Sequence, residues 1–174
     1  LLAAGFFFIL KRNYFILIFS VLVFIQSAFL FFYIVKPHTD NFSIGMQDCF
    51  KYIGEWFSNN ASKDSRIILG DVGTMGYYSD RYIIDAQALI NRDLLLNKDI
   101  MATPLSDREK LTNALRFISA DYLVQRDSIS DPFSGKLIGN YKLEFLFNRR
   151  FPGLGISDNS PKYYNVYHIL KTNQ

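Results

Sequence analysis

Cysteine and histidine are scarce in this chain, and their scarcity excludes several kinds of site. The 174 residues include one cysteine, Cys49, so an internal disulfide and a cysteine-rich metal site are both excluded. Cys49 lies on the apolar face of a predicted helix, which predicts a buried thiol. The two histidines, His38 and His168, are far apart and have no further ligand at a suitable spacing. We therefore predict no metal site.

Strong charge of one sign is also missing. The net charge is +3 and the basic residues form no block, so nucleic acid is not an expected partner. No serine is accompanied by a histidine and an acid in a nucleophile motif, and no lysine follows the glycines as it does in a phosphate-binding loop. We assign no catalytic residue and expect no cofactor.

Long apolar runs, in contrast, are prominent near the N-terminus. Residues 14–35 contain no charged residue and match the roughly 20 residues that a helix needs to cross a bilayer. Tyr14 and Tyr33 lie near the two ends, where tyrosine favours the membrane interface. A signal peptide would have a shorter apolar region and a cleavage site, which does not follow Val35. A buried helix of this length would find too little surface in so small a protein. We therefore predict a transmembrane helix, with the lipid bilayer as its partner.

The residues before this run predict a second membrane segment. Residues 1–10 are apolar but too few to span a bilayer, which indicates the end of a transmembrane helix. A short polar turn would join the two segments into a helical hairpin. Its Lys11 and Arg12 favour the cytoplasmic side, which would place residues 37–174 outside the cytoplasm. Because the chain begins at Leu1 within an apolar run, we expect it to be part of a longer membrane protein.

The remaining residues, 37–174, alternate between helix and strand patterns. An amphipathic helix is predicted over Ser43–Asn60, and a capping box of Ser106 and Glu109 begins another helix over 104–120. Strands are predicted at 65–70, 82–84, 122–125, 141–147 and 163–170, and loops or connectors at 37–42, 126–136 and 148–162. We predict a small three-layer-like α/β domain with a mixed sheet.

A glycine-rich unit between the first two strands organises this domain. Asp71 follows the first strand, Gly73 and Gly76 come next, and the second strand ends on Asp85. We predict structural roles for both glycines, in a sharp turn and in close packing. A parallel pair of strands needs a crossover of about a dozen residues, which this segment barely provides. An antiparallel pair therefore remains an alternative.

The same unit offers the best candidate for a binding site. A dinucleotide fingerprint is not met, because it requires glycine where the chain has Asp71. Asp71 and Asp85 end successive strands, and Tyr77 lies between them, which predicts a small polar pocket at the strand ends. The alternative is structural: Asp71 would cap the turn and Asp85 the next helix.

The segment beginning at Asp71 resembles part of the extracytoplasmic tail of many bacterial multi-spanning glycosyltransferases. These are enzymes of the GT-C type, similar to the dolichyl-phosphate-mannose protein mannosyltransferase and arabinosyltransferase-like families. The positions that carry the resemblance are Trp56, Ile67–Leu69, Asp71, Gly73, Gly76, Tyr77, Asp85, Asp121, Tyr122 and Tyr167. The resemblance implies transfer of a sugar from a polyprenyl-phosphate carrier to a glycan, lipid or protein acceptor outside the cytoplasm.

In that interpretation the chain supplies the last membrane helices and an accessory soluble domain of the enzyme. The catalytic acid of such enzymes lies in a loop after the first membrane helix, so the resemblance assigns no catalytic residue here. The alternative is a non-enzymatic, membrane-anchored α/β binding module at the cell envelope.

Overall fold

The computed structural model describes residues 2–85, 115, 119–133, 137–138, 140–153 and 160–172. Most of the helix predicted over 104–120, including Ser106 and Glu109, lies outside the described residues. Within it, Leu115 is helical and buried, whereas residues 119–120 are not helical.

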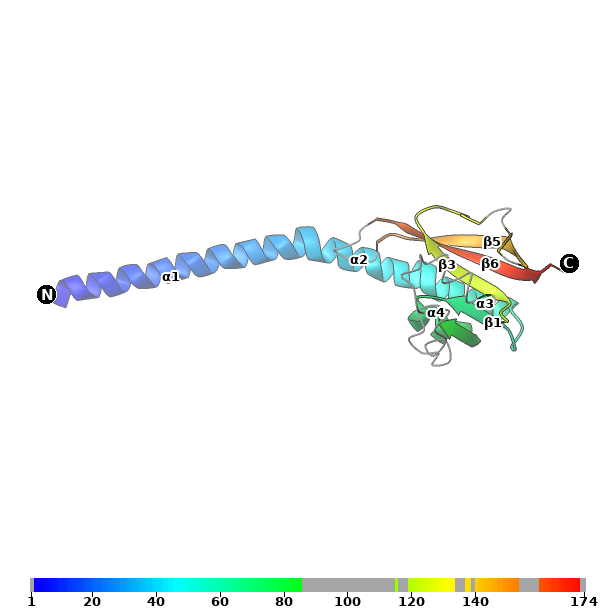
Figure 1. The fold of residues 1–174 in the computed structure, drawn as a ribbon. Helices are drawn as coiled ribbons and strands as arrows, with labels where there is room; N and C mark the ends of the chain where they lie inside the picture. The colour runs from blue at the N-terminus through cyan, green and yellow to red at the C-terminus, as the bar shows by residue number, and fades with distance from the viewer. Residues whose placement is uncertain are drawn as a thin grey trace, which may run out of the picture.

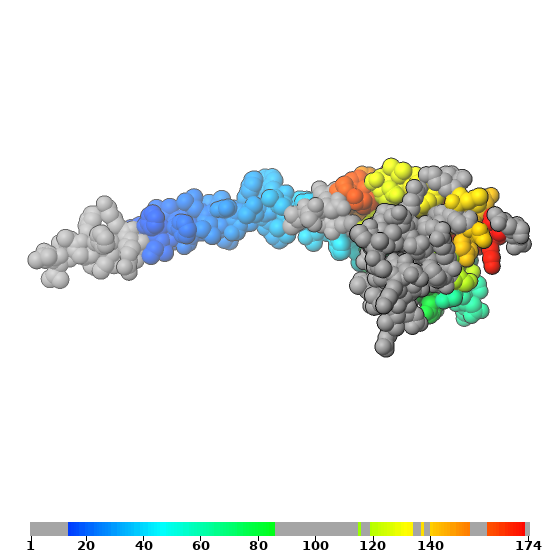
Figure 2. Space-filling view, in the orientation of Figure 1, coloured from blue at the N-terminus to red at the C-terminus, as the bar shows by residue number. Residues whose placement is uncertain are grey.

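A single unbroken helix leads from the apolar segment into the domain (Figure 1). It consists of α1 (Leu2–Leu30), a π-helical turn η1 (Phe31–Val35), α2 (Lys36–Gly45), a second π-helical turn η2 (Met46–Lys51) and α3 (Tyr52–Asn60). By length and composition, the stretch beginning at Tyr14 is apolar enough to cross a membrane, and its most apolar window is not buried in the protein. Figure 2 shows this segment projecting from the domain as a rod. So large an exposed apolar surface requires a lipid or protein environment.

The structure differs from the predicted helical hairpin, because Lys11–Asn13 continue α1 and form no turn. Lysine and arginine are good helix formers, and the segment contains no proline or glycine that would end the helix. The connector predicted at 37–42 is likewise helical and belongs to α2. Proline has no N–H to donate. The helix nevertheless continues through Pro37, because the π-helical turn just before it alters the hydrogen-bond ladder at that point. The Thr39 hydroxyl donates to the Val35 carbonyl at 3.0 Å.

The described strands form one mixed sheet, in the order β2-β1-β3-β6-β5-β4. Parallel pairs join β1 (Arg66–Leu69) to β2 (Tyr82–Asp85) and to β3 (Tyr122–Asp127). Antiparallel pairs join β6 (Lys162–Lys171) to β3 and to β5 (Tyr141–Phe151), and β4 (Leu137–Ile138) to β5. The predicted α/β fold with a mixed sheet is confirmed.

The glycine-rich unit also has the predicted order of elements. Helix α4 (Val72–Ser79) connects β1 to β2, and the two strands are parallel, so the antiparallel alternative is excluded. Several details differ from the prediction: β3 continues to Asp127 and β5 to Phe151, and the short strand β4, which was not predicted, follows the predicted loop 126–136. Pairing with β6 supports the longer β5, since Phe151 lies opposite Lys162.

Apolar cores lie on both faces of the sheet, in agreement with a three-layer arrangement. On one face, η2, α3 and α4 pack against the sheet through residues that include Cys49, Ile53, Phe57 and Met75, each at most 1% exposed. The predicted burial of the thiol is confirmed. The opposite core includes Ile68, Leu115, Phe133 and Tyr167. Each large apolar side chain that is fully buried contributes roughly 1.5–3 kcal/mol to folding.

The direction of the strands determines which edge of the sheet lies nearest the apolar segment. Phe151, at the end of β5, packs on Phe42 of α2, with a ring-centroid distance of 5.8 Å. Because β6 is antiparallel to both β3 and β5, strands β1, β2, β3 and β5 all run the same way. Their C-terminal ends therefore lie on the side of the domain that faces the apolar segment (Figure 1).

Candidate functional site

A carboxylate is held at the C-terminal end of β1 by residues from two neighbouring strands. Asp71 follows β1, and its Oδ2 accepts a hydrogen bond of 2.8 Å from the Tyr164 hydroxyl of β6. Nη1 of Arg126, on β3, lies 3.7 Å from the same oxygen. Arg126 and Tyr164 are opposite each other in the β3–β6 register. The Asp71 and Arg126 side chains are 29% and 38% exposed, so solvent reaches the ion pair and its contribution to stability is about 1 kcal/mol at most.

The Tyr164 hydroxyl and the Cys49 thiol, both near this edge, have raised pKa values. Burial raises the pKa of the Tyr164 hydroxyl well above its ordinary value, and the charge of Asp71 raises it further. Burial also raises the pKa of the Cys49 thiol to about 12, although Arg149 acts in the opposite direction. Both groups therefore stay protonated near neutral pH. A neutral buried thiol is a poor nucleophile, so Cys49 is not prepared for nucleophilic attack, and the protonated Tyr164 hydroxyl remains a hydrogen-bond donor to Asp71.

A second tyrosine–aspartate pair stabilises the loop after β3, on the opposite face of the sheet. The Tyr167 hydroxyl donates to Asp131 Oδ1 at 3.1 Å, and the Asp131 N–H donates to Asn165 Oδ1 at 2.9 Å. Asp131 has a φ of 48°, a left-handed conformation that costs energy for a residue other than glycine. The hydrogen bonds to Tyr167 and to the fully buried Asn165 offset that cost.

The structure separates the residues of the predicted pocket. Asp71 and Asp85 do lie on the same edge, and Asp85 is opposite Leu69 in the β1–β2 register, with no exposed surface. Tyr77 lies on α4, is 81% exposed and packs edge-on against Tyr78. Asp71 stands at the N-terminus of α4, but its side chain makes no capping hydrogen bond there. The carboxylate is paired with Tyr164 and Arg126 instead.

Neither predicted glycine has a conformation or a contact that requires glycine. Gly73 and Gly76 lie within α4, and neither has a left-handed backbone. A Cβ on Gly73 would meet no atom of a described residue within 4 Å, and one on Gly76 would lie 3.4 Å from Cγ1 of Ile83, an ordinary contact. Close packing instead requires Gly45, which faces the Phe151 ring, and Gly54, which faces α4.

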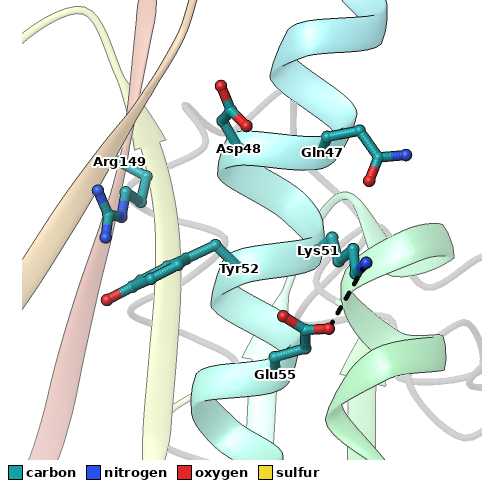
Figure 3. A pocket seen from close by; sticks show the side chains of 6 residues that line it. All are labelled: Gln47, Asp48, Lys51, Tyr52, Glu55 and Arg149. Carbon is teal, nitrogen blue, oxygen red and sulfur yellow. Dashed lines mark ion pairs between the residues drawn. The ribbon is translucent and has the colours of Figure 1, made fainter.

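A groove along the outer side of η2 and α3 adds a second candidate (Figure 3). Its volume is about 460 Å³, and it is lined by Gln47, Asp48, Lys51, Tyr52, Glu55 and Arg149. The Arg149 guanidinium lies over the Tyr52 ring, 3.6 Å from its centroid. Lys51 and Glu55 form an ion pair of 3.7 Å across one turn of the helix.

Sequence reasoning missed the partners of both sites. Arg126 and Arg149 fell in predicted loops, and Tyr164 fell in a strand without a predicted neighbour. The alternation of β6 would have placed Tyr164 on the same face as Val166, but strand order and register were needed to bring Tyr164 to Asp71. Within the part of the chain that the structure describes, no three His, Cys, Asp or Glu side chains gather as a metal would require.

A comparison with known protein families found a match that covers most of the α/β domain. A family model described as Domain of unknown function (DUF8728) matches residues 41–167. The chain belongs to the DUF8728 family. The matched residues begin in α2 and end in β6, so the DUF8728 match covers both candidate sites and begins after the apolar segment. No curated protein and no solved structure matches the chain.

Proposed function

We propose that this chain is the membrane-anchored accessory domain of a glycosyltransferase that uses a polyprenyl-phosphate-linked sugar. The domain lies outside the cytoplasm and holds a glycan, lipid or protein acceptor close to the membrane surface. The observation that carries this proposal is the unbroken helix, which is exposed and apolar over residues 14–35 and part of the domain core at Cys49, Ile53 and Phe57.

The helix fixes the height of the domain above the membrane. Gly45 lies ten residues beyond Val35, which is about 15 Å of helix at 1.5 Å per residue. At Gly45 the helix meets Phe151 and the edge of the sheet that carries Asp71. A flexible linker would let the domain move freely, whereas a helix without a break keeps this edge close to the head groups. An acceptor bound at this edge would be close to a lipid-linked donor.

An accessory role agrees with the chemistry of the described residues. Tyr164 and Cys49 have raised pKa values and are buried, so neither is prepared for nucleophilic attack or proton transfer. Asp71 is engaged by Tyr164 and Arg126. The catalytic acid would come from other membrane segments of the enzyme, as the resemblance to GT-C glycosyltransferases implies.

The test changes the height of the domain and leaves its fold intact. Seven helix-forming residues inserted between Asp40 and Asn41 add nearly two turns, which raises the domain by about 10 Å and almost preserves its orientation. The assay measures sugar transfer from a polyprenyl-phosphate donor in membranes that contain the full-length protein. We expect transfer to fall by about tenfold or more, because small displacements of a bound reactant are costly. The same insertion between Lys63 and Asp64, in an exposed turn, is the matched control.

Two results would overturn the proposal. Wild-type membranes that transfer no sugar would favour the non-enzymatic binding module. Full transfer by the Asp40–Asn41 insertion variant, with a domain still folded by limited proteolysis, would show that the height of the domain is irrelevant to the reaction.

A further inference from the structure

The groove beside η2 and α3 is formed by residues of the helix and by one residue of the sheet. Five of its residues lie on the helix; Tyr52 extends toward Arg149 of β5, and Gln47 and Lys51 extend the other way, toward α4 (Figure 3). The helix residues are Gln47, Asp48, Lys51, Tyr52 and Glu55, which recur with the spacing of neighbours on a helix surface. The volume of about 460 Å³ lies within the range of small-ligand pockets, roughly 300–1,000 Å³.

Several side chains that line this groove have hydrogen-bonding groups without a protein partner. Among the described residues, none forms a hydrogen bond or ion pair with the side chains of Gln47, Asp48 or Tyr52. Arg149 contacts the Tyr52 ring, and its Nε is buried without a hydrogen-bond partner in the described structure. An amide, a carboxylate, a phenol and a guanidinium together supply both donors and acceptors.

The charges of the groove indicate which class of ligand fits. Asp48 and Glu55 balance Lys51 and Arg149, so the lining has no net charge and gives no advantage to a phosphate or to a strong cation. Hydroxyl groups suit such a lining, because each can donate to a carboxylate and accept from an amide or guanidinium. The Arg149 guanidinium covers one face of the Tyr52 ring, and the residue is 39% exposed, so its uncovered part can contact apolar C–H groups of a ligand.

We propose that this groove binds a neutral, hydroxyl-rich glycan. The proposal rests on the function given above and deepens it, because it names the acceptor class and the surface that holds it. Gln47 lies twelve residues beyond Val35, so the groove begins about 18 Å along the helix from the end of the apolar run. A glycan in the groove lies along the helix, with one end toward the membrane.

Calorimetric titration of the complete chain with defined saccharides tests this proposal. The protein is held in an amine-oxide detergent, because maltoside detergents carry a sugar that would compete. The probes are linear tetrasaccharides of glucose, of mannose and of N-acetylglucosamine. We expect saturable binding of at least one of them, and Asp48→Asn should weaken it by about tenfold, as the loss of a charged acceptor predicts.

Asp64→Asn is the matched control, because Asp64 is an exposed carboxylate outside the groove, and it should bind like the wild type. Saturable binding that Asp48→Asn weakens and Asp64→Asn does not would support the proposal. Lack of binding by all three saccharides would overturn it, as would equal binding by Asp48→Asn and the wild type. These results are independent of the transfer assay: a groove that binds no glycan, with transfer still sensitive to domain height, would refute the glycan site alone.

Discussion

The ring of Phe151 occupies the space that a side chain on Gly45 would need. An ideal Cβ on Gly45 would lie 2.5 Å from two atoms of that ring. The ring is also packed against Phe50 and Tyr164, with centroid distances of 4.8 Å and 6.0 Å. This contact joins the helix to the end of β5, and so links the apolar segment to the sheet.

We expect Gly45→Ala to destabilise the domain. The Phe151 ring is enclosed by other aromatic rings and has little room to move, so overpacking should lower the free energy of unfolding by about 1–3 kcal/mol. Urea denaturation of the chain in detergent measures this effect. Gly73→Ala is the control, because its Cβ meets no atom within 4 Å among the residues that the structure describes, and alanine favours helix by up to about 1 kcal/mol. Equal stability of Gly45→Ala and the wild type would contradict the close packing of Gly45 against Phe151.

Alanine substitutions of Gly54, on α3, and Gly76, on α4, should also differ in their effect on stability. A Cβ on Gly54 would lie 2.9 Å from the Met75 carbonyl oxygen and 2.7 Å from Cβ of Tyr78, so α3 and α4 would have to separate. Gly54→Ala should therefore lower the melting temperature of the domain, with a cost of about 1–3 kcal/mol. Gly76→Ala should be tolerated, since its only near neighbour within 4 Å in the described structure is Ile83 Cγ1 at 3.4 Å. A lower melting temperature for Gly76→Ala than for Gly54→Ala would reverse this assignment.

Removal of the Tyr164 hydroxyl should have a moderate cost. Tyr164→Phe keeps the buried ring and deletes the 2.8 Å hydrogen bond to Asp71. A hydrogen bond to a charged group contributes about 1.5–3 kcal/mol, and the lower end applies here because Asp71 is partly exposed and keeps Arg126. Unfolding in urea near neutral pH measures the difference. Tyr163→Phe, on the neighbouring residue of β6, is the matched control; a similar loss in both variants would argue against a specific role of the Tyr164 hydroxyl.

Alkaline pH should destabilise the folded chain. The folded state raises the pKa of Tyr164 and Tyr167 above 10.0, and that of Cys49 from 9.0 to about 12. Above pH 9–10 the unfolded chain releases these protons and the folded chain retains them. The stabilisation is therefore complete below the ordinary pKa values and is lost as pH rises, by about 1.4 kcal/mol per pH unit for each group.

Urea titrations between about pH 8 and about pH 11 would show this loss as a falling unfolding free energy. Tyr167→Phe should flatten the dependence above the ordinary pKa of tyrosine, because it removes one of the retained protons. An unchanged slope in Tyr167→Phe would show that this hydroxyl does not keep its proton in the folded state.

The side of the membrane can be tested with one introduced thiol. Ser62→Cys lies in an exposed position after α3, whereas the natural Cys49 has no exposed surface and a raised pKa. In intact cells, a membrane-impermeant maleimide should label Ser62→Cys, and the wild-type protein should stay unlabelled. Labelling that appears after lysis and not before would place the domain in the cytoplasm.

Local patterns in the sequence determined the type and order of most elements. The run over residues 14–35 is apolar all round, and a helix is the form in which such a run can satisfy its backbone in lipid. The helix over Ser43–Asn60 and the strands next to Asp71 followed from short-range periodicity, which depends on neighbours along the chain. The burial of Cys49 followed from the same periodicity.

Contacts between residues that are distant in sequence determined the features that depend on strand order and register. The pairing of Asp71 with Tyr164 and Arg126 depends on the order β1-β3-β6, which no local pattern contains. Gly45 and Gly54, unlike the predicted Gly73 and Gly76, are needed for packing, because their neighbours Phe151 and Tyr78 come from other elements. Whether a position in a helix requires glycine depends on the atom that a side chain there would collide with. That atom comes from another element, so only the tertiary structure reveals it.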